Sequence, residues 1–499
     1  MIEIKYREEF SKMEANILSD RELSALGTMT PADKYKLFRE KYTEFIYEKF
    51  LIDESEDEYK LSFVFHIPGL SKFVPTWTLK KPDKERLTAD DPILKRLVFS
   101  LGLVELISYW KIACPKTVRI KAGKLCREQA EWWKSQYLSG LGEFFYRNEI
   151  SVTFEDFMAI ESDGPDFTSA VLETSDLQDK LDGCLIPVGG GKDSIVTLNL
   201  LSDLRKKSVC YVMNSRGATD SSALGAGYKA EQILNVSRTL DQNMLELNKQ
   251  GYLNGHTPFS ALVAFSGVLM AELYGKKYVV LSNESSANES TVAGSNVNHQ
   301  YSKSFQFEAD FDHYIKSFIG SKVQYFSILR PWSEFQIAAY FSSLTDFHSV
   351  FRSCNAGSKT NSWCGKCAKC LFVALLLTPF LSDESITDIF GRKILEDAQL
   401  VPILNELCGL SPEKPFECVG SREEISTAMM LGIKIREKNR LSLPYLLTYF
   451  KETDIFSETV QNGNRYFDYY QEENLLPPEF DARMRSETAK LKEKFKELL

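Results

Sequence analysis

The chain has 499 residues, of which 43% are apolar and 26% are charged, a balance typical of globular proteins. Its net charge of −9 argues against an extended nucleic-acid footprint, and no apolar run has the length that a membrane-spanning helix needs. The N-terminal stretch MIEIKYREEF lacks the apolar core of a signal peptide, so we expect a cytoplasmic protein with neither a membrane nor a nucleic acid as its partner.

Residues 1–175 are expected to form an N-terminal α+β region. Apolar and polar residues alternate between 58 and 81, which predicts strands, and helical spacing predicts helices at 92–114 and 127–148. The stretch 161–179 is polar and rich in turn residues, which indicates a linker.

The character of the sequence changes between residues 176 and 380, where short β-branched or aromatic runs alternate with helical stretches. Such alternation predicts βαβ units, and hence an α/β fold built on a parallel, twisted sheet. The predicted strands are 184–188, 208–214, 277–283 and 323–329, and the predicted helices are 192–206, 226–250 and 258–274. Residues 381–499 are mostly charged and helical in pattern and are expected to form a C-terminal helical region.

Three consecutive glycines, Gly189–Gly191, stand between the first strand of this sheet and the helix that follows. A turn without Cβ atoms lets backbone N–H groups approach an anion, and the helix N-terminus adds partial positive charge. Lys192 can neutralise a phosphate, and Asp193 can hold a divalent cation that binds one. Asp193 replaces the hydroxyl residue of a P-loop, and Ser194 replaces the third glycine of a dinucleotide fingerprint, so neither common motif fits.

The stretch GGGKDS resembles the pyrophosphatase loop of the N-type ATP pyrophosphatases, written Ser-Gly-Gly-x-Asp-Ser, with Gly189 in place of the first serine. The resemblance implies the parallel sheet of the adenine-nucleotide α-hydrolase type, known as the PP-loop fold. It also implies that ATP is cleaved between its α- and β-phosphates, so that a substrate oxygen becomes adenylated and pyrophosphate leaves. The alternative is an ordinary glycine-rich βα turn.

Four of the ten cysteines stand within the stretch 354–370. In a cytoplasmic chain, as expected here, this spacing indicates a metal site before disulfides, and four thiolates suit tetrahedral Zn²⁺. Because such a set leaves no coordination position open, we expect a structural ion. An iron–sulfur cluster and four buried free cysteines are the alternatives. The predicted ligands are Cys354, Cys364, Cys367 and Cys370.

Polar residues follow the predicted strands between the glycine turn and the cysteines, where an α/β interior would be apolar. Polar side chains at strand ends on one face indicate the wall of a site, and the alternative is a set of solvated loops. Ser421 and Glu424 have the spacing of a capping box, which predicts a helix start there. Cys418 precedes this helix start, where a thiol pKa can fall, although a lone cysteine is more often buried filler. The wall candidates are His256, Asn283, Glu284, Asn288, Glu289, Asn298, His299, Gln300, Lys303 and Glu308.

Six blocks between residues 180 and 430 together resemble the family of ATP-dependent UDP-N-acetylmuramoyl-L-alanyl-L-glutamate epimerases of peptidoglycan synthesis. These blocks are IPVGGGKDS, SNESSAN, VNHQYSKSFQFE, RPWSEFQI, SCN…WCGKCAKC and KPFECVG. The resemblance implies that the terminal L-Glu of a UDP-muramoyl dipeptide is adenylated with ATP and Mg²⁺ and inverted to D-Glu, releasing AMP and diphosphate. It leaves residues 1–175 as the material for a UDP-muramoyl groove.

The resemblance also assigns expected roles to individual residues. ATP and Mg²⁺ would be bound by the loop residues Gly189, Gly190, Gly191, Lys192, Asp193 and Ser194, of which Lys192 and Asp193 would be catalytic. Further nucleotide contacts are expected from Asn214, Arg216, Asn283, Glu284 and Asn288. The candidates for proton transfer are, in order, His299, Lys303, His256 and Cys418.

Two other classes of function stay open, and the sequence indicates no oligomeric state. The loop and the cysteine spacing are also similar to 7-cyano-7-deazaguanine synthase, so the chain could activate a carbonyl of a deazapurine or a tRNA, although its acidic charge disfavours tRNA. The second alternative is a zinc-stabilised binding module without catalysis, which the intact Lys192-Asp193-Ser194 disfavours.

Overall fold

The computed structural model describes residues 17–84, 86–167, 180–292, 294–295, 297–357 and 360–496. The chain divides into two compact units, each assembled from segments that are distant in sequence. Unit 1 consists of Met1–Asp182, Asn235–Lys277 and Asp310–Gln324, and unit 2 consists of Gly183–Leu234, Tyr278–Ala309 and Tyr325–Leu499. The division into domains at 1–175, 176–380 and 381–499 stays a prediction, and most of the predicted linker at 161–179 lies outside the described residues.

Unit 1 is built on a mixed sheet with the strand order β9-β4-β2-β1-β5-β6, and β3 pairs with β2 outside this path. The pairs β1–β2, β2–β3, β2–β4 and β4–β9 are antiparallel, whereas β1–β5 and β5–β6 are parallel. The expected parallel sheet is therefore only part of the structure, because short connections between successive strands force them to run in opposite directions. The strands are β1 (Glu44–Glu54), β2 (Glu58–Ile67), β3 (Ser71–Phe73), β4 (Thr76–Lys80), β5 (Thr117–Ile120), β6 (Ala159–Ser162) and β9 (Ile233–Thr239).

The strands predicted at 58–81 and the helices predicted at 92–114 and 127–148 are confirmed in unit 1. Helix α4 (Pro92–Trp110) is buried at nearly every position and packs against β1, β2 and α11 (Phe259–Leu273), which explains why its sequence is apolar on all sides. The other helices of unit 1 are α2 (Asp20–Ala25), α3 (Pro31–Lys41), α5 (Arg127–Gly140), α6 (Gly142–Arg147), α7 (Phe154–Phe157) and α10 (Gln242–Lys249).

The region 226–250 corrects one sequence prediction, because it contains β9 and the short helix α10 instead of one continuous helix. In β9, Leu234 and Val236 are buried whereas the residues between and beside them are not, so burial follows the two-residue period of a strand. The side chain of Asp241 then accepts a hydrogen bond from the backbone N–H of Asn243, which starts α10 only at that point.

Unit 2 is built on four strands in the order β11-β10-β7-β8. β7 (Cys184–Pro187) is parallel to both its neighbours, β8 (Val209–Met213) and β10 (Tyr278–Leu281), as the βαβ pattern predicted. Helix α8 (Lys192–Leu200) follows β7 and α9 (Gly217–Gly225) follows β8, while β11 (Gln324–Ser327) is the last strand of this group. Because parallel strands end at the same edge, the glycine turn and the segments after β8 and β10 lie along one edge of the sheet.

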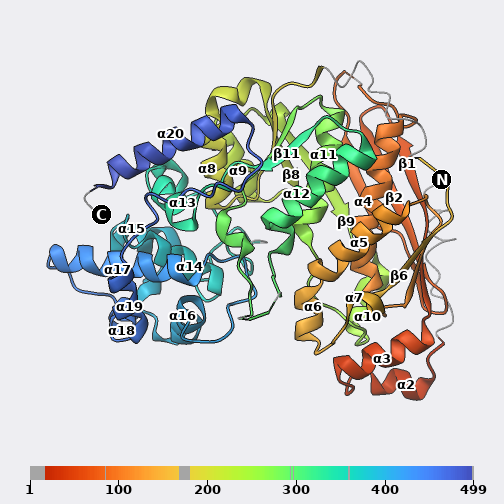
Figure 1. The fold of residues 1–499 in the computed structure, drawn as a ribbon, viewed down its shortest axis with the longest axis horizontal. Coiled ribbons are helices and arrows are strands. Elements are labelled where there is room, and N and C mark those ends of the chain that lie inside the picture. The colour runs from red at the N-terminus through yellow and green to blue at the C-terminus, as the bar shows by residue number, and fades with distance from the viewer. Residues whose placement is uncertain are drawn as a thin grey trace. The chain divides into compact units, whose positions relative to one another are not determined.

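Helices dominate unit 2 after residue 368, as predicted for 381–499, and Figure 1 shows α14–α19 gathered in one helical cluster. Every residue of α14 (Ala368–Leu377) is buried, because α13, α16 and α17 pack around it. None of the described helices has both the length and the apolar character needed to cross a membrane. The other helices are α13 (Glu334–Phe341), α15 (Asp383–Phe390), α16 (Val401–Cys408), α17 (Arg422–Lys438), α18 (Tyr445–Lys451), α19 (Asp454–Asn462) and α20 (Pro478–Lys494).

Candidate active site

The glycine turn after β7 has the geometry of an anion cradle. Gly190 has a φ of +79°, and a Cβ atom there would lie 2.9 Å from the carbonyl carbon of Ala218 in α9, so only glycine fits without strain. The backbone N–H groups of Gly189–Gly191 make no hydrogen bond to another described residue. Gly191 caps α8, so these groups lie at the positive end of a helix of nine residues.

Lys192 is buried beside this turn with two carboxylates on its ammonium group. Its Nζ atom contacts Oδ1 of Asp193 and Oε2 of Glu334, and its side chain is 1% exposed. Burial works against a charge on Lys192, but the two carboxylates outweigh burial and raise its pKa. Burial would raise the pKa of Asp193, but the ammonium of Lys192 outweighs burial and lowers that pKa. For Glu334 burial is the stronger effect and raises the pKa. Lys192 and Asp193 therefore stay charged at neutral pH.

Glu334 is a functional candidate that the sequence analysis missed. It is buried at the first position of α13, directly after the capping residue Ser333. The sequence feature that could have indicated it is a carboxylate at the start of an apolar helix. Its backbone N–H donates to Oε1 of Glu424 at 2.7 Å, and the N–H of Ser421 donates to Oε2 of Glu424 at 2.6 Å. The predicted capping box of Ser421 and Glu424 is thereby confirmed, and burial raises the pKa of Glu424.

Three of the four proton-transfer candidates meet at Cys418. The Nζ atom of Lys303 lies 3.2 Å from Sγ of Cys418, and the side chain of His299 hydrogen-bonds to the same thiol. Lys369, in the first turn of α14, donates from Nζ to the carbonyl oxygen of Cys418. Burial alone would raise the pKa of Cys418, but Lys303, His299 and Lys369 lower it to about 6, so the thiolate predominates at neutral pH. Lys303 is also buried, yet this thiolate raises its pKa.

The glycine turn and the surroundings of Cys418 form one charged cluster. Lys369 and Lys303 both contribute to lowering the pKa of Asp193, although neither contacts it as closely as Lys192 does. The carboxylate of Glu284, after β10, attracts the ammonium of Lys303 and helps to raise the pKa of Lys303. We refer below to Lys192, Asp193, Lys303, Glu334 and Cys418 as the charged cluster.

A fully buried ion pair positions two segments of this cluster. Arg330 is 0% exposed and pairs with Glu308 on α12 (Phe305–Tyr314) at 2.7 Å. Its guanidinium also donates to the carbonyl oxygens of Glu284 at 2.7 Å and of Lys303 at 2.6 Å. Glu308 was predicted from the sequence as part of a site wall, whereas Arg330 was not predicted. The feature that could have indicated Arg330 is a cation next to a proline at the end of an apolar strand.

The four predicted metal ligands are brought together by the cysteine loop at 354–370. Their Sγ atoms all lie within 4.8 Å of one another, with 3.9 Å between Cys354 and Cys367 and 3.8 Å between Cys364 and Cys370. Thiol sulfurs at these separations can share one tetrahedral ion. Gly365 has a φ of +64°, which lets the chain turn sharply between the ligands.

The cysteine loop also contacts both ends of the charged cluster. The backbone N–H of Arg352, just before the loop, donates to the carbonyl oxygen of Gly190 at 2.8 Å. On the other side, Oε2 of Glu417 accepts hydrogen bonds from the backbone N–H of Lys369 at 3.0 Å and from the Asn355 amide at 3.3 Å. The loop therefore supports the glycine turn and the residue that precedes Cys418.

The residues predicted to contact nucleotide lie after the strands of unit 2. Asn214 and Arg216 are exposed after β8, and Asn283 and Glu284 are buried after β10. Asn288 is exposed, and Ser194 in α8 donates from its hydroxyl to the carbonyl oxygen of Gly191 at 2.9 Å. Their nucleotide contacts stay a prediction.

His256, the remaining proton-transfer candidate, belongs to unit 1. Its Nδ1 atom lies 3.5 Å from Oε2 of Glu143 in α6. Glu143 is thus a carboxylate neighbour of His256 within the same unit, and the role of His256 in proton transfer stays a prediction.

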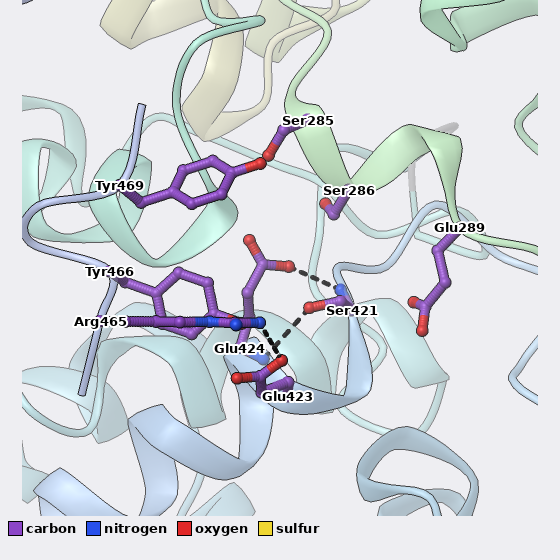
Figure 2. A pocket seen from close by; sticks show the side chains of 9 residues that line it. All are labelled: Ser285, Ser286, Glu289, Ser421, Glu423, Glu424, Arg465, Tyr466 and Tyr469. Atoms are coloured by element: carbon purple, nitrogen blue, oxygen red, sulfur yellow. Dashed lines mark hydrogen bonds and ion pairs between the residues drawn. The ribbon is translucent and has the colours of Figure 1, made fainter. Parts of the chain in front are cut away.

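A pocket of about 240 Å³ adjoins the charged cluster within unit 2. Figure 2 shows the carboxylate of Glu424 amid the lining side chains, with Tyr469 and Ser285 pointing toward each other across the pocket. Because Glu424 also accepts the backbone N–H of Glu334, this wall connects directly to the charged cluster. The pocket is lined by Ser285, Ser286, Glu289, Ser421, Glu423, Glu424, Arg465, Tyr466 and Tyr469.

The fold and this site define an α/β protein with a glycine-rich strand–turn–helix loop, a buried charged cluster and a four-cysteine loop. The family described as MurL N-terminal domain matches residues 37–328, and the family described as MurL C-terminal domain matches residues 347–454. The chain therefore belongs to the MurL family.

Curated relatives of this chain carry the name UDP-N-acetyl-alpha-D-muramoyl-L-alanyl-L-glutamate epimerase. The chain is 35% identical to the protein of this name from Xanthomonas oryzae pv. oryzae over 337 residues, which cover 66% of the chain and 72% of that protein. It is 32% identical over 394 residues to the proteins of this name from a Micromonospora species and from Salinispora tropica, covering 78% of the chain and 86% and 84% of those proteins. No solved structure matches the chain significantly.

Proposed function

We propose that this protein is an ATP-dependent epimerase that converts the terminal L-Glu of UDP-N-acetylmuramoyl-L-alanyl-L-glutamate to D-Glu, releasing AMP and diphosphate. The names of the relatives support the substrate and the epimerisation. The observation that carries the proposal is that one charged cluster contains both Lys192 and Asp193, directly after a glycine turn fit for a phosphate, and a thiolate fit for proton abstraction.

The reaction explains why an epimerase needs a phosphate-binding loop. A free carboxylate resists the loss of its α-proton, because a second negative charge would accumulate next to the first. Transfer of adenylate to the carboxylate removes the first charge and makes the carbonyl an electron sink. Cations and backbone dipoles can then stabilise the enolate that forms. After the proton is returned on the other face, water hydrolyses the acyl-adenylate and AMP leaves.

The loop residues are proposed to hold ATP in the PP-loop manner. The free N–H groups of Gly189–Gly191 and the N-terminus of α8 suit the phosphates. Asp193 and Glu334 are the carboxylates placed to hold Mg²⁺, and Lys192 is placed to neutralise the departing diphosphate. A bound Mg²⁺ supplies charge neutralisation for the phosphates. The residues after β8 and β10, Asn214 and Asn283 among them, are proposed to contact the rest of the nucleotide.

Cys418 is proposed to be the base that removes the α-proton. Its thiolate predominates at neutral pH, and a base with a pKa just below the working pH is well matched to proton transfer. The ammonium of Lys303 keeps the thiolate charged and lies where it can stabilise the enolate oxygen. His299 hydrogen-bonds to the same thiol and is proposed to relay the proton.

The four cysteines are proposed to bind one structural Zn²⁺. All four donors are thiols, their separations suit one tetrahedral ion, and such a set leaves no position for substrate. When bound, the ion cross-links the loop, and the loop in turn supports Gly190 and Glu417. Residues 1–175 are proposed to bind the uridine diphosphate end of the UDP-muramoyl part of the substrate.

The decisive experiment incubates the protein with ATP, Mg²⁺ and UDP-N-acetylmuramoyl-L-alanyl-L-glutamate in deuterated water. We expect AMP to form and deuterium to enter the α-position of the terminal glutamate, with D-Glu released after acid hydrolysis. Asp193→Ala should abolish both signals, and Cys418→Ala should abolish the deuterium while adenylation continues. Absence of both AMP and deuterium with the wild-type protein would overturn the proposal.

A further inference from the structure

The pocket beside the charged cluster has its charges already paired. Glu423 pairs with Arg465, and Glu289 pairs with Lys414. Both oxygens of Glu424 accept backbone N–H groups, one from Glu334 and one from Ser421. The pocket therefore offers three carboxylates and a single guanidinium that is already engaged, which disfavours a phosphate or a carboxylate as its occupant.

The uncharged groups of the pocket indicate what kind of ligand it accepts. Ser286 is 8% exposed, and its hydroxyl has no hydrogen-bond partner among the described residues. A buried hydroxyl without a partner is unfavourable, so a ligand that supplies one gains affinity there. Figure 2 shows Ser285, Ser286 and Ser421 on the side of the pocket across from the rings of Tyr466 and Tyr469. Hydroxyl groups opposite aromatic rings suit a neutral ligand that has polar groups at its edge and an apolar face to pack on a ring.

The position of the pocket connects this ligand to the reacting carboxylate. Ser285 directly follows Glu284, whose backbone carbonyl is held by Arg330. On the opposite wall, Glu424 accepts the N–H of Glu334, and the carboxylate of Glu334 contacts Lys192. A group in the pocket thus lies near the loop that is proposed to activate the substrate, as would a sugar that is joined to the glutamyl residue through the short lactyl and L-alanyl link.

We propose that this pocket is a sugar subsite, which binds the neutral N-acylated sugar ring of the substrate through Ser286 and the two tyrosines. The inference rests on the proposed function, because it takes the substrate's sugar as the ligand. It assigns the charged cluster to the glutamyl carboxylate and the pocket to the part of the substrate that carries hydroxyl and amide groups but no charge.

The kinetic test compares a substrate that has the sugar with one that lacks it. Initial rates of AMP formation are measured with UDP-N-acetylmuramoyl-L-alanyl-L-glutamate and with N-acetyl-L-alanyl-L-glutamate. Ser286→Ala should raise KM for the sugar-bearing substrate about fivefold, the loss of one hydrogen bond, and leave the sugar-free peptide unaffected. Ser457→Ala, at an exposed position of α19, is the matched control. Equal effects on both substrates, or none on either, would contradict the subsite.

A binding test does not depend on turnover and separates this inference from the proposed function. Saturation-transfer NMR with N-acetylglucosamine should give signals with the wild-type protein that are lost in Ser286→Leu and weakened in Tyr469→Phe. If the wild-type protein forms no AMP with either substrate, the proposed function fails, and this measurement alone decides the subsite. Signals that survive both substitutions, or no signal from the wild-type protein, would overturn it.

Discussion

The Nζ atom of Lys303 lies 3.2 Å from the Sγ atom of Cys418, although the two residues are 115 positions apart in the chain. An ammonium so close to a buried thiol favours the thiolate, and the thiolate favours the ammonium. The pair therefore holds a base and a cation together at neutral pH. Arg330 fixes one half of this arrangement by donating to the carbonyl oxygen of Lys303, and Lys369 fixes the other by donating to that of Cys418.

The pH dependence of epimerisation should report this thiolate. Because the pKa of Cys418 is lowered to about 6, kcat/KM should fall as the pH drops through about 6 and the thiolate becomes protonated. Lys303→Gln removes the main cation that lowers this pKa, so the acidic limb should move to higher pH. The same shift should appear in the pH profile of iodoacetamide alkylation at Cys418, followed by peptide mass spectrometry. An unchanged limb in Lys303→Gln would mean that another group titrates.

The two neighbouring glycines of the turn should respond differently to substitution. A Cβ atom on Gly190 would lie 2.9 Å from backbone of α9, and its φ is positive, whereas nothing lies within 4 Å of a Cβ on Gly189. Gly190→Ala should therefore be strained by roughly 1–3 kcal/mol and lose ATP–pyrophosphate exchange. Gly189→Ser should keep it, because the turn has room for a hydroxyl. Exchange that survives in Gly190→Ala would remove the turn from the mechanism.

The buried contact between Lys192 and Glu334 should contribute measurably to stability. Glu334→Gln leaves a buried ammonium with Asp193 as its one remaining carboxylate, and breaking a buried ion pair costs about 3–5 kcal/mol. Glu423→Gln breaks an exposed pair with Arg465 and should cost about 0–1 kcal/mol. Urea unfolding of both variants gives the comparison, and equal losses would show that Lys192 finds another partner.

Removal of the metal should be detectable at Cys418 as well as in overall stability. We expect about one equivalent of zinc per chain, and its removal by a strong chelator should lower the unfolding temperature. Because Glu417 is held by Lys369 and Asn355 of the cysteine loop, the alkylation rate of Cys418 should also change. Cys364→Ser should lose the metal, whereas Cys126→Ser, at an exposed position outside the loop, should keep it. Full zinc content in Cys364→Ser would contradict the proposed ligand set.

The sequence predicted a structural feature correctly where the residues that specify it are nearly consecutive. The glycine turn, the capping box of Ser421 and Glu424 and the parallel strands on both sides of β7 are of this kind, and the structure has them where the sequence placed them. The strand β9 was missed because its alternation covers few residues and lies next to a true helix.

The amino-acid sequence already shows which chemical groups are available: a phosphate-type turn with Lys192 and Asp193, four cysteines in close spacing and a set of polar residues after the strands. Which of these groups act together depends on the three-dimensional fold. The fold joins Lys303 to Cys418, and it joins Lys192 to Glu334, which is 142 positions away. The physical reason is that periodicity reports which face of an element is buried, whereas the charge state of a side chain depends on long-range packing that brings its partners close and excludes water.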